Sequence, residues 1–231
     1  MLVYGKNVCL EYLESNKRIN KIFLSDKFND NEIKDLINRR HINVKHVSKN
    51  DMDRKCSGLH QGIIMEVQDY EYASIDCILN KDNALVVMLD HIEDPHNFGA
   101  IIRTCEAAGV DAIIIPNDRS VCVNATVIKT SVGTTEKVNI IKVTNLVNTI
   151  NELKKNGYWI FGTDMDGEDY TKLDYKGKTC IICGNEGKGM SPIITKNCDF
   201  IASIPMNGSV NSLNASVATG IILFEAVNKR R

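Results

Sequence analysis

Two polar loops in the last third of the chain contain residue types that could hold a ligand. The first is Gly-Asn-Glu-Gly-Lys-Gly at residues 184–189, which follows an apolar run at residues 180–183. The second lies within residues 204–216 and is rich in Asn and Ser, with Pro205 and Gly208 to bend it. Glycine permits close approach of the backbone, so such loops bind ligands mainly through main-chain groups. In open α/β sheets, ligands collect beyond the carboxyl ends of strands, and we expect both loops to open into one crevice.

A third polar loop, at residues 90–97, follows another apolar run and is expected to face the same crevice. Asn97 at its end is expected to cap the next helix, and Arg103 lies about 9 Å further along that helix at about 1.5 Å per residue. Arg103 stands among apolar residues, so it must either find a structural partner or reach a cavity and serve a function. Glu186 in the first loop could pair with Arg103 or His96, or could orient a substrate hydroxyl.

Other interpretations of these loops are weaker. The glycine spacing at residues 184–189 fits neither a dinucleotide fingerprint nor a Walker loop, although two ordinary turns of an α/β domain would look similar. Cys180 and Cys183 have CxxC spacing, but isoleucines separate them within an apparent strand and no second ligand pair follows. His91 and His96 lack a third metal ligand at useful spacing. We therefore expect no metal site.

Composition places the chain among ordinary globular proteins. Its 231 residues are enough for one large or two modest domains, with 43% hydrophobic and 25% charged residues. The net charge of −1 shows no overall basic excess, which is a mild argument against a nucleic-acid partner. No apolar stretch is long enough to span a bilayer, and the first residues lack the apolar core of a signal peptide. A cytoplasmic protein without a membrane partner is expected.

The first 72 residues predict a small α/β domain. Helices are expected at residues 7–13 and 30–40, and strands at residues 21–26, 42–47 and 62–67. Doubled basic residues occur at Lys17-Arg18, Arg39-Arg40 and Arg54-Lys55. These pairs could be solvated helix ends, or they could contact phosphates.

Residues 73–84 carry no strand pattern and are expected to link this domain to a second one at residues 85–231. In the second domain, strand-like apolar runs alternate with helical patterns. Strands are expected at residues 85–90, 112–115, 138–143, 158–163, 179–183 and 200–204, and helices at residues 97–108, 121–130, 146–155 and 212–228. This alternation predicts an α/β fold with a parallel sheet covered on both faces.

Three segments of the second domain resemble the ordered motifs of the SpoU/TrmH (SPOUT) family of RNA ribose 2′-O-methyltransferases. They are residues 97–109, residues 184–189, and residues 204–206 with 212–218. The first domain, with Val-Tyr-Gly-Lys-Asn-Val at residues 3–8 and His-Gln-Gly-Ile at residues 60–63, resembles the ribosomal-protein-like RNA-binding domain of one subgroup. That subgroup methylates a guanosine of 23S rRNA. The resemblance implies a trefoil-knotted fold, a homodimer, and S-adenosyl-L-methionine bound in the knot.

Carried over motif by motif, the resemblance also implies a set of site residues. The methyl donor would lie against Thr163, Gly184, Ile204, Met206, Ser212 and Leu213. The catalytic constellation would be Asn97, Arg103, Glu186 and Asn214. The reaction would be an in-line displacement in which a ribose 2′-oxygen attacks the sulfonium methyl carbon. Because a guanidinium with a pKa above about 12 almost never loses its proton, we expect Arg103 to bind phosphate and stabilise the developing alkoxide, oriented by Glu186.

The resulting expectation is a cytoplasmic, dimeric RNA ribose methyltransferase that acts on a guanosine of 23S rRNA. Within the family, a tRNA ribose methyltransferase is the alternative, because target choice resides in the less distinctive first domain. From another class, an RNA-binding protein could keep the same fold without catalysis. The presence of Asn97, Arg103 and Glu186 argues against that alternative.

Overall fold

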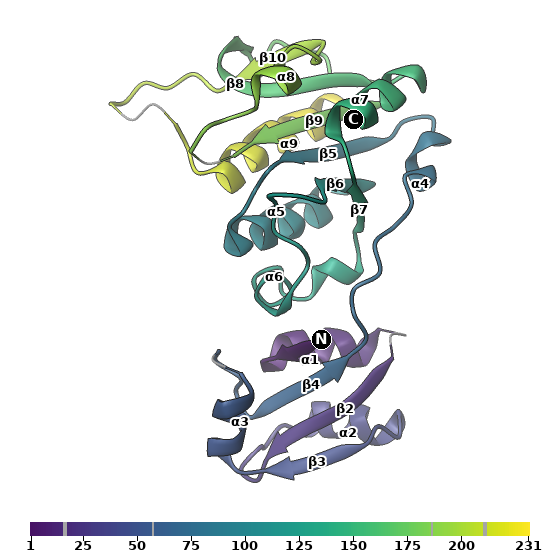
Figure 1. Ribbon diagram of the computed structural model, residues 1–231, viewed down its shortest axis with the longest axis vertical. Coiled ribbons are helices and arrows are strands. Elements are labelled where there is room, and N and C mark those ends of the chain that lie inside the picture. Colours follow the sequence, from purple (N-terminus) through teal and green to yellow (C-terminus); the bar gives the residue numbers. More distant parts are fainter. Residues whose placement is uncertain (16–17, 57, 186, 210–211) are drawn as a thin grey trace. The chain divides into compact units, whose positions relative to one another are not determined.

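The computed structural model describes residues 1–231 except 16–17, 57, 186 and 210–211 (Figure 1). The chain forms two compact units. The first unit contains residues 1–71 and 123–136, and the second contains residues 72–122 and 137–231. The segment at residues 123–136 therefore interrupts the second unit in sequence and belongs to the first.

The first unit is built on a four-stranded sheet in the order β1-β4-β2-β3. Its strands are β1 (Leu2–Tyr4), β2 (Ile19–Ser25), β3 (Val44–Val47) and β4 (Ile63–Val67), and its first three helices are α1 (Lys6–Glu14), α2 (Asn31–Arg39) and α3 (Lys49–Lys55). The side chains of Asp30 and Ser48 accept hydrogen bonds that begin α2 and α3. Neither β1 nor α3 was predicted from the sequence, because three residues are too few to show alternation and α3 buries only Met52.

Residues 123–136 add helix α6 (Ala125–Thr130) and the 3-10 helix η1 (Thr134–Glu136) to the first unit. The Tyr12 hydroxyl donates to Glu136 Oε1 at 3.2 Å, and the Tyr70 hydroxyl donates to the Thr135 carbonyl at 3.2 Å. The Lys129 ammonium lies 5.1 Å from the centre of the Tyr4 ring. These contacts join a late segment of the chain to its first residues.

The second unit is built on a six-stranded sheet in the order β10-β8-β9-β5-β6-β7, and every pairing in it is parallel. Its strands are β5 (Leu85–Asp90), β6 (Ala112–Pro116), β7 (Asn139–Val143), β8 (Trp159–Asp169), β9 (Thr179–Gly184) and β10 (Phe200–Ser203). The predicted α/β fold with a parallel sheet is confirmed.

Helices cover both faces of this sheet (Figure 1). Helices α5 (Pro95–Ala108) and α9 (Ala215–Lys229) pack against each other on one face. On the other face, α4 (Asp76–Leu79), α7 (Leu146–Lys155) and α8 (Pro192–Thr195) contribute side chains to one apolar cluster with alternate strand residues. Because parallel strands all point one way, every loop after a strand opens at the same end of the sheet, which we call the carboxyl end.

The structure corrects some of the expected boundaries. Helix α5 begins at Pro95, and the Asp94 carboxylate caps it by accepting from the His96 amide at 3.0 Å, so Asn97 is inside the helix and is not its cap. Residues 73–84, which showed no pattern, contain α4. The expected helix at residues 121–130 is shorter, because Asn124 caps it. No helix is described between β8 and β9, so the alternation of strand and helix is not strict there.

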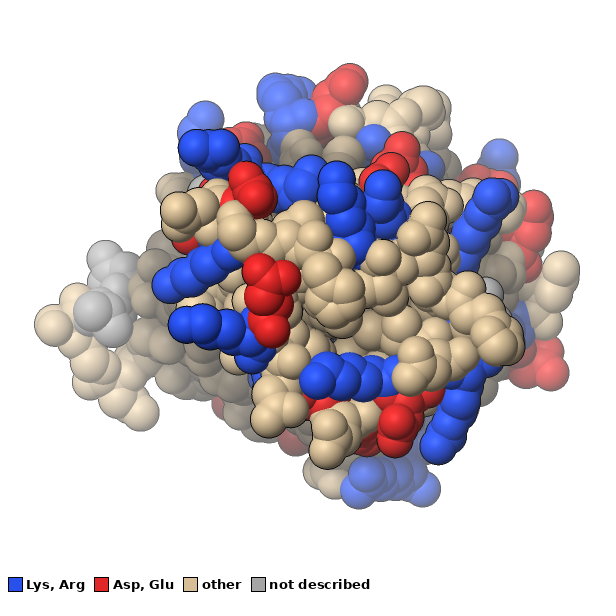
Figure 2. Space-filling view, turned by 90° about the horizontal axis from the view of Figure 1, so that it is seen from below, with Lys and Arg blue, Asp and Glu red and all other residues tan. Residues whose placement is uncertain are grey.

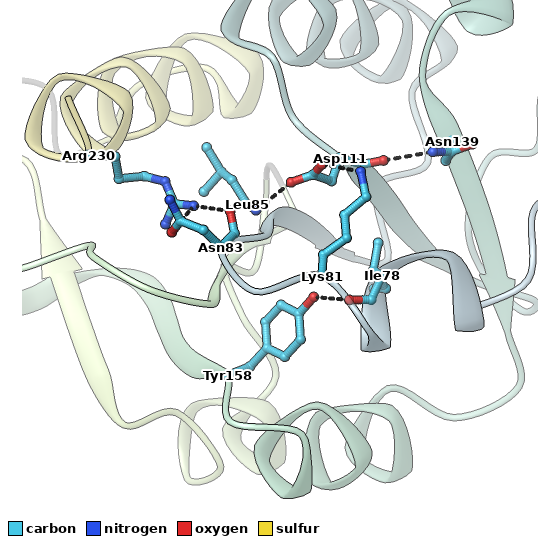
Figure 3. A network of polar contacts seen from close by, with 8 residues as sticks. All are labelled: Ile78, Lys81, Asn83, Leu85, Asp111, Asn139, Tyr158 and Arg230. Atoms are coloured by element: carbon cyan, nitrogen blue, oxygen red, sulfur yellow. Dashed lines mark hydrogen bonds and ion pairs between the residues drawn. The ribbon is translucent and has the colours of Figure 1, made fainter.

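The amino end of the sheet, where the strands begin, is closed by a polar network (Figure 3). The Arg230 guanidinium, at the end of α9, donates to Asn83 O and Oδ1 before β5, and to the carbonyls of Tyr175 and Gly177 before β9. Asp111 accepts from the Leu85 amide at 2.8 Å and from Lys81 at 2.6 Å. This network ties the linker, two strands and the last helix together. Among the described residues, no helix is long and apolar enough to cross a membrane.

Candidate functional site

The loop after β9 folds back on itself at the carboxyl end of the sheet. The Asn185 amide donates to the Gly189 carbonyl at 3.0 Å, and the Gly189 amide donates to the Asn185 carbonyl at 2.9 Å. Gly189 has φ +65°, which favours glycine. A Cβ atom on Gly184 would lie 2.3 Å from Gly189 C and from Met190 N, so only glycine lets the backbone return this closely. The glycines therefore set the shape of the loop.

This loop forms one wall of a cavity of about 360 Å³ that we call the loop cavity. The other walls come from the middle of β8, from residues 202–206 and from the start of α9. All residues expected to contact a cofactor line this cavity: Thr163, Gly184, Ile204, Met206, Ser212 and Leu213. The structure thus brings together three segments that are far apart in the sequence.

Two of the expected catalytic residues are in direct contact. The Asn214 side-chain amide donates to Asn97 Oδ1 at 2.9 Å, which joins the start of α9 to the first turn of α5. Asn214 is also the N-cap of α9, since its Oδ1 accepts from the Ser216 amide at 2.9 Å. The bond to Asn97 and the cap together fix the Asn214 side chain beside the loop cavity, to which Leu213 and Ala215 contribute.

The other two expected catalytic residues are placed differently. Arg103 is exposed on α5, on the side away from the buried residues Ile101, Ile102 and Cys105. It therefore needs no buried partner, contrary to the expectation from its apolar neighbours, and within the described residues it makes no hydrogen bond or ion pair. Glu186 lies outside the described residues.

A buried acidic residue at the end of β5 was not singled out by sequence analysis. The Asp90 side chain is 1% exposed. Its Oδ1 lies 2.5 Å from His91 Nδ1, and its Oδ2 accepts from the Ser191 amide at 2.7 Å. The His91 carbonyl in turn accepts from the Asn185 side chain at 2.8 Å. The loops after β5 and β9 are therefore hydrogen-bonded to each other. The sequence signal for Asp90 was the cluster of ionisable residues at positions 90–97.

The cysteine pair in β9 is a poor candidate for chemistry. Cys180 and Cys183 are both buried, and an odd separation along a strand directs them to opposite faces of the sheet. Burial raises the pKa of the Cys183 thiol to about 11, so it is protonated at neutral pH. In the part of the chain that the structure describes, no group of three or more His, Cys, Asp or Glu side chains could hold a metal ion.

Two family models match the chain, one over each part. The model of the SpoU rRNA Methylase family matches residues 84–224. The model described as RNA 2′-O ribose methyltransferase substrate binding matches residues 2–73.

Relatives match over the full length of the chain. A Staphylococcus saprophyticus protein assigned to the TrmH family of tRNA/rRNA methyltransferases is 42% identical over 239 residues, which cover 100% of this chain and 96% of the relative. Bacillus subtilis YacO, assigned to the same family, is 36% identical over 237 residues, covering 99% of this chain and 95% of the relative.

Solved structures share the fold. The SpoU methyltransferase AviRb of Streptomyces viridochromogenes, crystallised with the cofactor AdoMet, superposes with a TM-score of 0.85 at 24% identity, covering 99% of this chain and 90% of AviRb. The TrmH/SpoU tRNA modifying enzyme of A. aeolicus superposes with a TM-score of 0.59 at 36% identity. That match covers 66% of this chain and 78% of the A. aeolicus chain, so it extends over part of the molecule.

Proposed function

The chain belongs to the SpoU/TrmH family of RNA methyltransferases, and from that premise we propose that it transfers a methyl group from S-adenosylmethionine to a ribose 2′-hydroxyl of RNA. The observation that carries the proposal is the loop cavity. Part of β8, the loop at residues 184–189 and the segment that leads into α9 converge there, next to the Asn97–Asn214 hydrogen bond. The match of residues 2–73 to an RNA 2′-O ribose methyltransferase substrate-binding model supports RNA as the substrate.

The loop cavity fits a donor of this kind. Its volume of about 360 Å³ lies within the range of about 300–1,000 Å³ common for small-ligand pockets. Ile204, Met206 and Leu213 provide apolar contacts for a flat base, while Thr163 and Ser212 provide hydroxyls. Backbone groups of the glycine loop add donors and acceptors, as is typical where a loop closes over a ligand. When bound there, S-adenosylmethionine supplies an electrophilic methyl carbon on a sulfonium centre.

The protein's own task is to hold the ribose hydroxyl in line with that methyl carbon. Asn97 and Asn214 position the hydroxyl beside the cavity, since each side chain is restrained by the other. Arg103, which is exposed on α5, binds the phosphate next to the ribose and stabilises the charge that develops on the 2′-oxygen. It does not act as the base, because a guanidinium keeps its proton at neutral pH.

The role of Arg103 is testable with two substitutions. Arg103→Lys keeps the positive charge, so we expect it to retain part of the methyl-transfer rate, whereas Arg103→Ala should lose at least about a hundredfold. Filter binding measures RNA affinity alongside the rate. Equal loss of rate in Lys and Ala variants, with RNA affinity unchanged, would contradict charge stabilisation.

The first unit supplies the RNA contact in this proposal. The Lys55 ammonium lies 4.3 Å and the Lys21 ammonium 5.6 Å from the centre of the Phe23 ring, so two cations flank one aromatic side chain on the sheet. On the surface seen in Figure 2, Lys and Arg side chains stand around an uncharged area, with acidic side chains between some of them. A neutral protein can thus still offer cations to a phosphate backbone.

The finer assignment within this proposal is a guanosine ribose of 23S rRNA, with two copies of the chain in a homodimer and the donor held in a trefoil knot. A tRNA ribose is the second candidate, supported by the 36% identity to the A. aeolicus tRNA modifying enzyme. Mapping ribose methylation in total RNA from cells with and without the gene distinguishes these targets. Isothermal titration with S-adenosylmethionine tests whether the chain binds the donor, and absence of binding would favour a non-catalytic RNA-binding protein.

A further inference from the structure

A second and larger cavity lies at the carboxyl end of the same sheet. Its volume is about 640 Å³, and we call it the dyad cavity because Asp90 and His91 line it. Loops after β5, β6, β7 and β9 contribute to it. Nothing in the proposed binding of the methyl donor uses this space.

The dyad cavity combines an apolar floor with a charged rim. The buried side chains of Pro116, Leu146, Met190 and Ile194 form the floor. The rim carries the exposed residues Glu93, Asp118, Arg119 and Lys188. Within the described part of the chain, none of these four makes an ion pair, so both cations and both carboxylates are available to a ligand.

The backbone around the cavity is held in unusual conformations. His91 has φ +62° and Arg119 has φ +49°, and both line the cavity. Left-handed backbone costs free energy for residues with a Cβ atom, and it is retained mainly where it positions functional groups. Helix α7, which has ten residues, begins at the rim with Asn145 as its N-cap, so its positive end also faces the cavity.

The dyad cavity and the loop cavity share a wall. Asn185, Lys188 and Gly189 line both of them. A polymer whose reacting sugar lies at the loop cavity can therefore place a neighbouring group in the dyad cavity. The rim offers cations for phosphate and hydrogen-bonding groups for base edges, and the floor offers apolar surface for a flat ring.

We propose that the dyad cavity receives the base of an unpaired nucleotide of the RNA substrate, with Arg119 and Lys188 on its phosphate. This proposal rests on the proposed function, since it assumes that RNA is the substrate. Glu93 and Asp118 accept hydrogen bonds from the base edge, which favours bases that present N–H donors. The cavity thus contributes to the choice of the RNA site, separately from the donor.

Two substitutions test the proposal in the full-length protein. Thr144→Trp places a bulky side chain at an exposed position of the lining, and Arg119→Gln removes a rim cation. We expect the KM for RNA to rise by about tenfold or more for Thr144→Trp and by about three- to tenfold for Arg119→Gln. The Kd for S-adenosylmethionine should stay within about twofold of the wild type. Matched controls are Asn151→Trp and Lys155→Gln, which are exposed on α7 outside the lining and should change neither value.

A crosslinking measurement separates this proposal from the proposed function. RNA from cells lacking the gene, labelled with 4-thiouridine and irradiated with the wild-type protein, should form adducts at residues 116–119 or 144–147. Adducts there support the cavity even if no methyl is transferred. Adducts only elsewhere, together with unchanged RNA kinetics in Thr144→Trp, would overturn the proposal while leaving the methyltransferase intact. Binding of free GMP that survives saturation with RNA would assign the cavity to a small metabolite and would also overturn it.

Discussion

The two ends of the parallel sheet in the second unit are built from the same kinds of polar groups, but these groups are used differently. At the amino end, Arg230 and Asp111 are surrounded by partners from the protein itself (Figure 3). At the carboxyl end, Arg119 and Lys188 stand on the rims of open cavities. The difference separates groups that stabilise the fold from groups that are held ready for a ligand.

The amino end illustrates the first use. Burial lowers the pKa of Arg230, yet a guanidinium remains charged at any physiological pH, so it must be solvated by the protein. Carbonyls at Asn83, Tyr175 and Gly177 do this, and each belongs to a segment that ends where a strand begins. The carboxyl end has bonds too, but they join loops to each other and leave the cavities open.

The largest effect is expected from Gly184→Ala at the carboxyl end. The new Cβ would meet the backbone of Gly189 and Met190 at 2.3 Å, so the loop that lines the cavity must shift. We expect the Kd for S-adenosylmethionine to rise at least about a hundredfold, measured by isothermal titration. Gly208→Ala is the control, because a Cβ there meets nothing within 4 Å. An unchanged Kd for Gly184→Ala would mean that the loop does not hold the donor.

Arg230→Met should have the next largest effect, and only on stability. The substitution leaves several carbonyls at the amino end without their donor, so we expect the free energy of unfolding to fall by about 3 kcal/mol in urea denaturation. The Kd for S-adenosylmethionine should not change. Arg231→Met, at the exposed last residue, is the control and should be neutral. A loss of donor affinity at 25 °C in folded Arg230→Met would remove the distinction between the two ends.

The Asn97–Asn214 bond should show a smaller, coupled effect. Asn214→Ala removes both the bond and a helix cap, which predicts a loss of about 1–2 kcal/mol in the free energy of unfolding. Asn97→Ala removes the bond and leaves the cap of α9 in place. A double-mutant cycle measured on the methyl-transfer rate should give a coupling of about 1 kcal/mol or more, beyond the coupling in stability. Equal coupling in rate and in stability would make the pair structural, like the contacts at the amino end.

The smallest effect is expected at the Lys81–Asp111 ion pair. Hydrogen bonding to Asp111 raises the pKa of Lys81, so the pair stabilises the fold below the ordinary lysine pKa and this contribution is lost as pH rises through the raised value. Because Lys81 is half exposed, Lys81→Met should cost less than about 1 kcal/mol at pH 7. Urea denaturation from pH 7 to 11 should show a constant difference from wild type that begins to shrink at the alkaline end. A difference that grows with pH would contradict this.

Sequence analysis was most reliable where strand direction alone decides geometry. Residues 184–189 and 204–213 follow separate parallel strands, so the sequence alone predicts that they converge. It failed at the start of α5, where Asp94 and Pro95 compete with Asn97 for the cap. Local preference identified a capping residue near the right place but could not choose between neighbours.

The dyad cavity and the Arg230 network could not be predicted in the same way. The partners of Arg230 come from residues 83, 175, 177 and 179, which share no spacing or motif. The sequence shows Asp90 and His91 as polar residues, but the dyad cavity that they line is formed by loops after four different strands. Such features arise from tertiary packing, which a single sequence does not specify locally.

The placement of residues 123–136 within the first unit affects how the protein is made on the ribosome. The chain is synthesised from its amino terminus, so the bonds from Tyr12 and Tyr70 can form only after Thr135 and Glu136 have been added. By then the residues of β5 and β6 have also been synthesised. The first unit therefore cannot finish folding until part of the second unit has been synthesised. A fragment that stops at residue 72 would lack the bonds from Tyr12 and Tyr70 to residues 135 and 136, and it should aggregate more readily than the full-length chain.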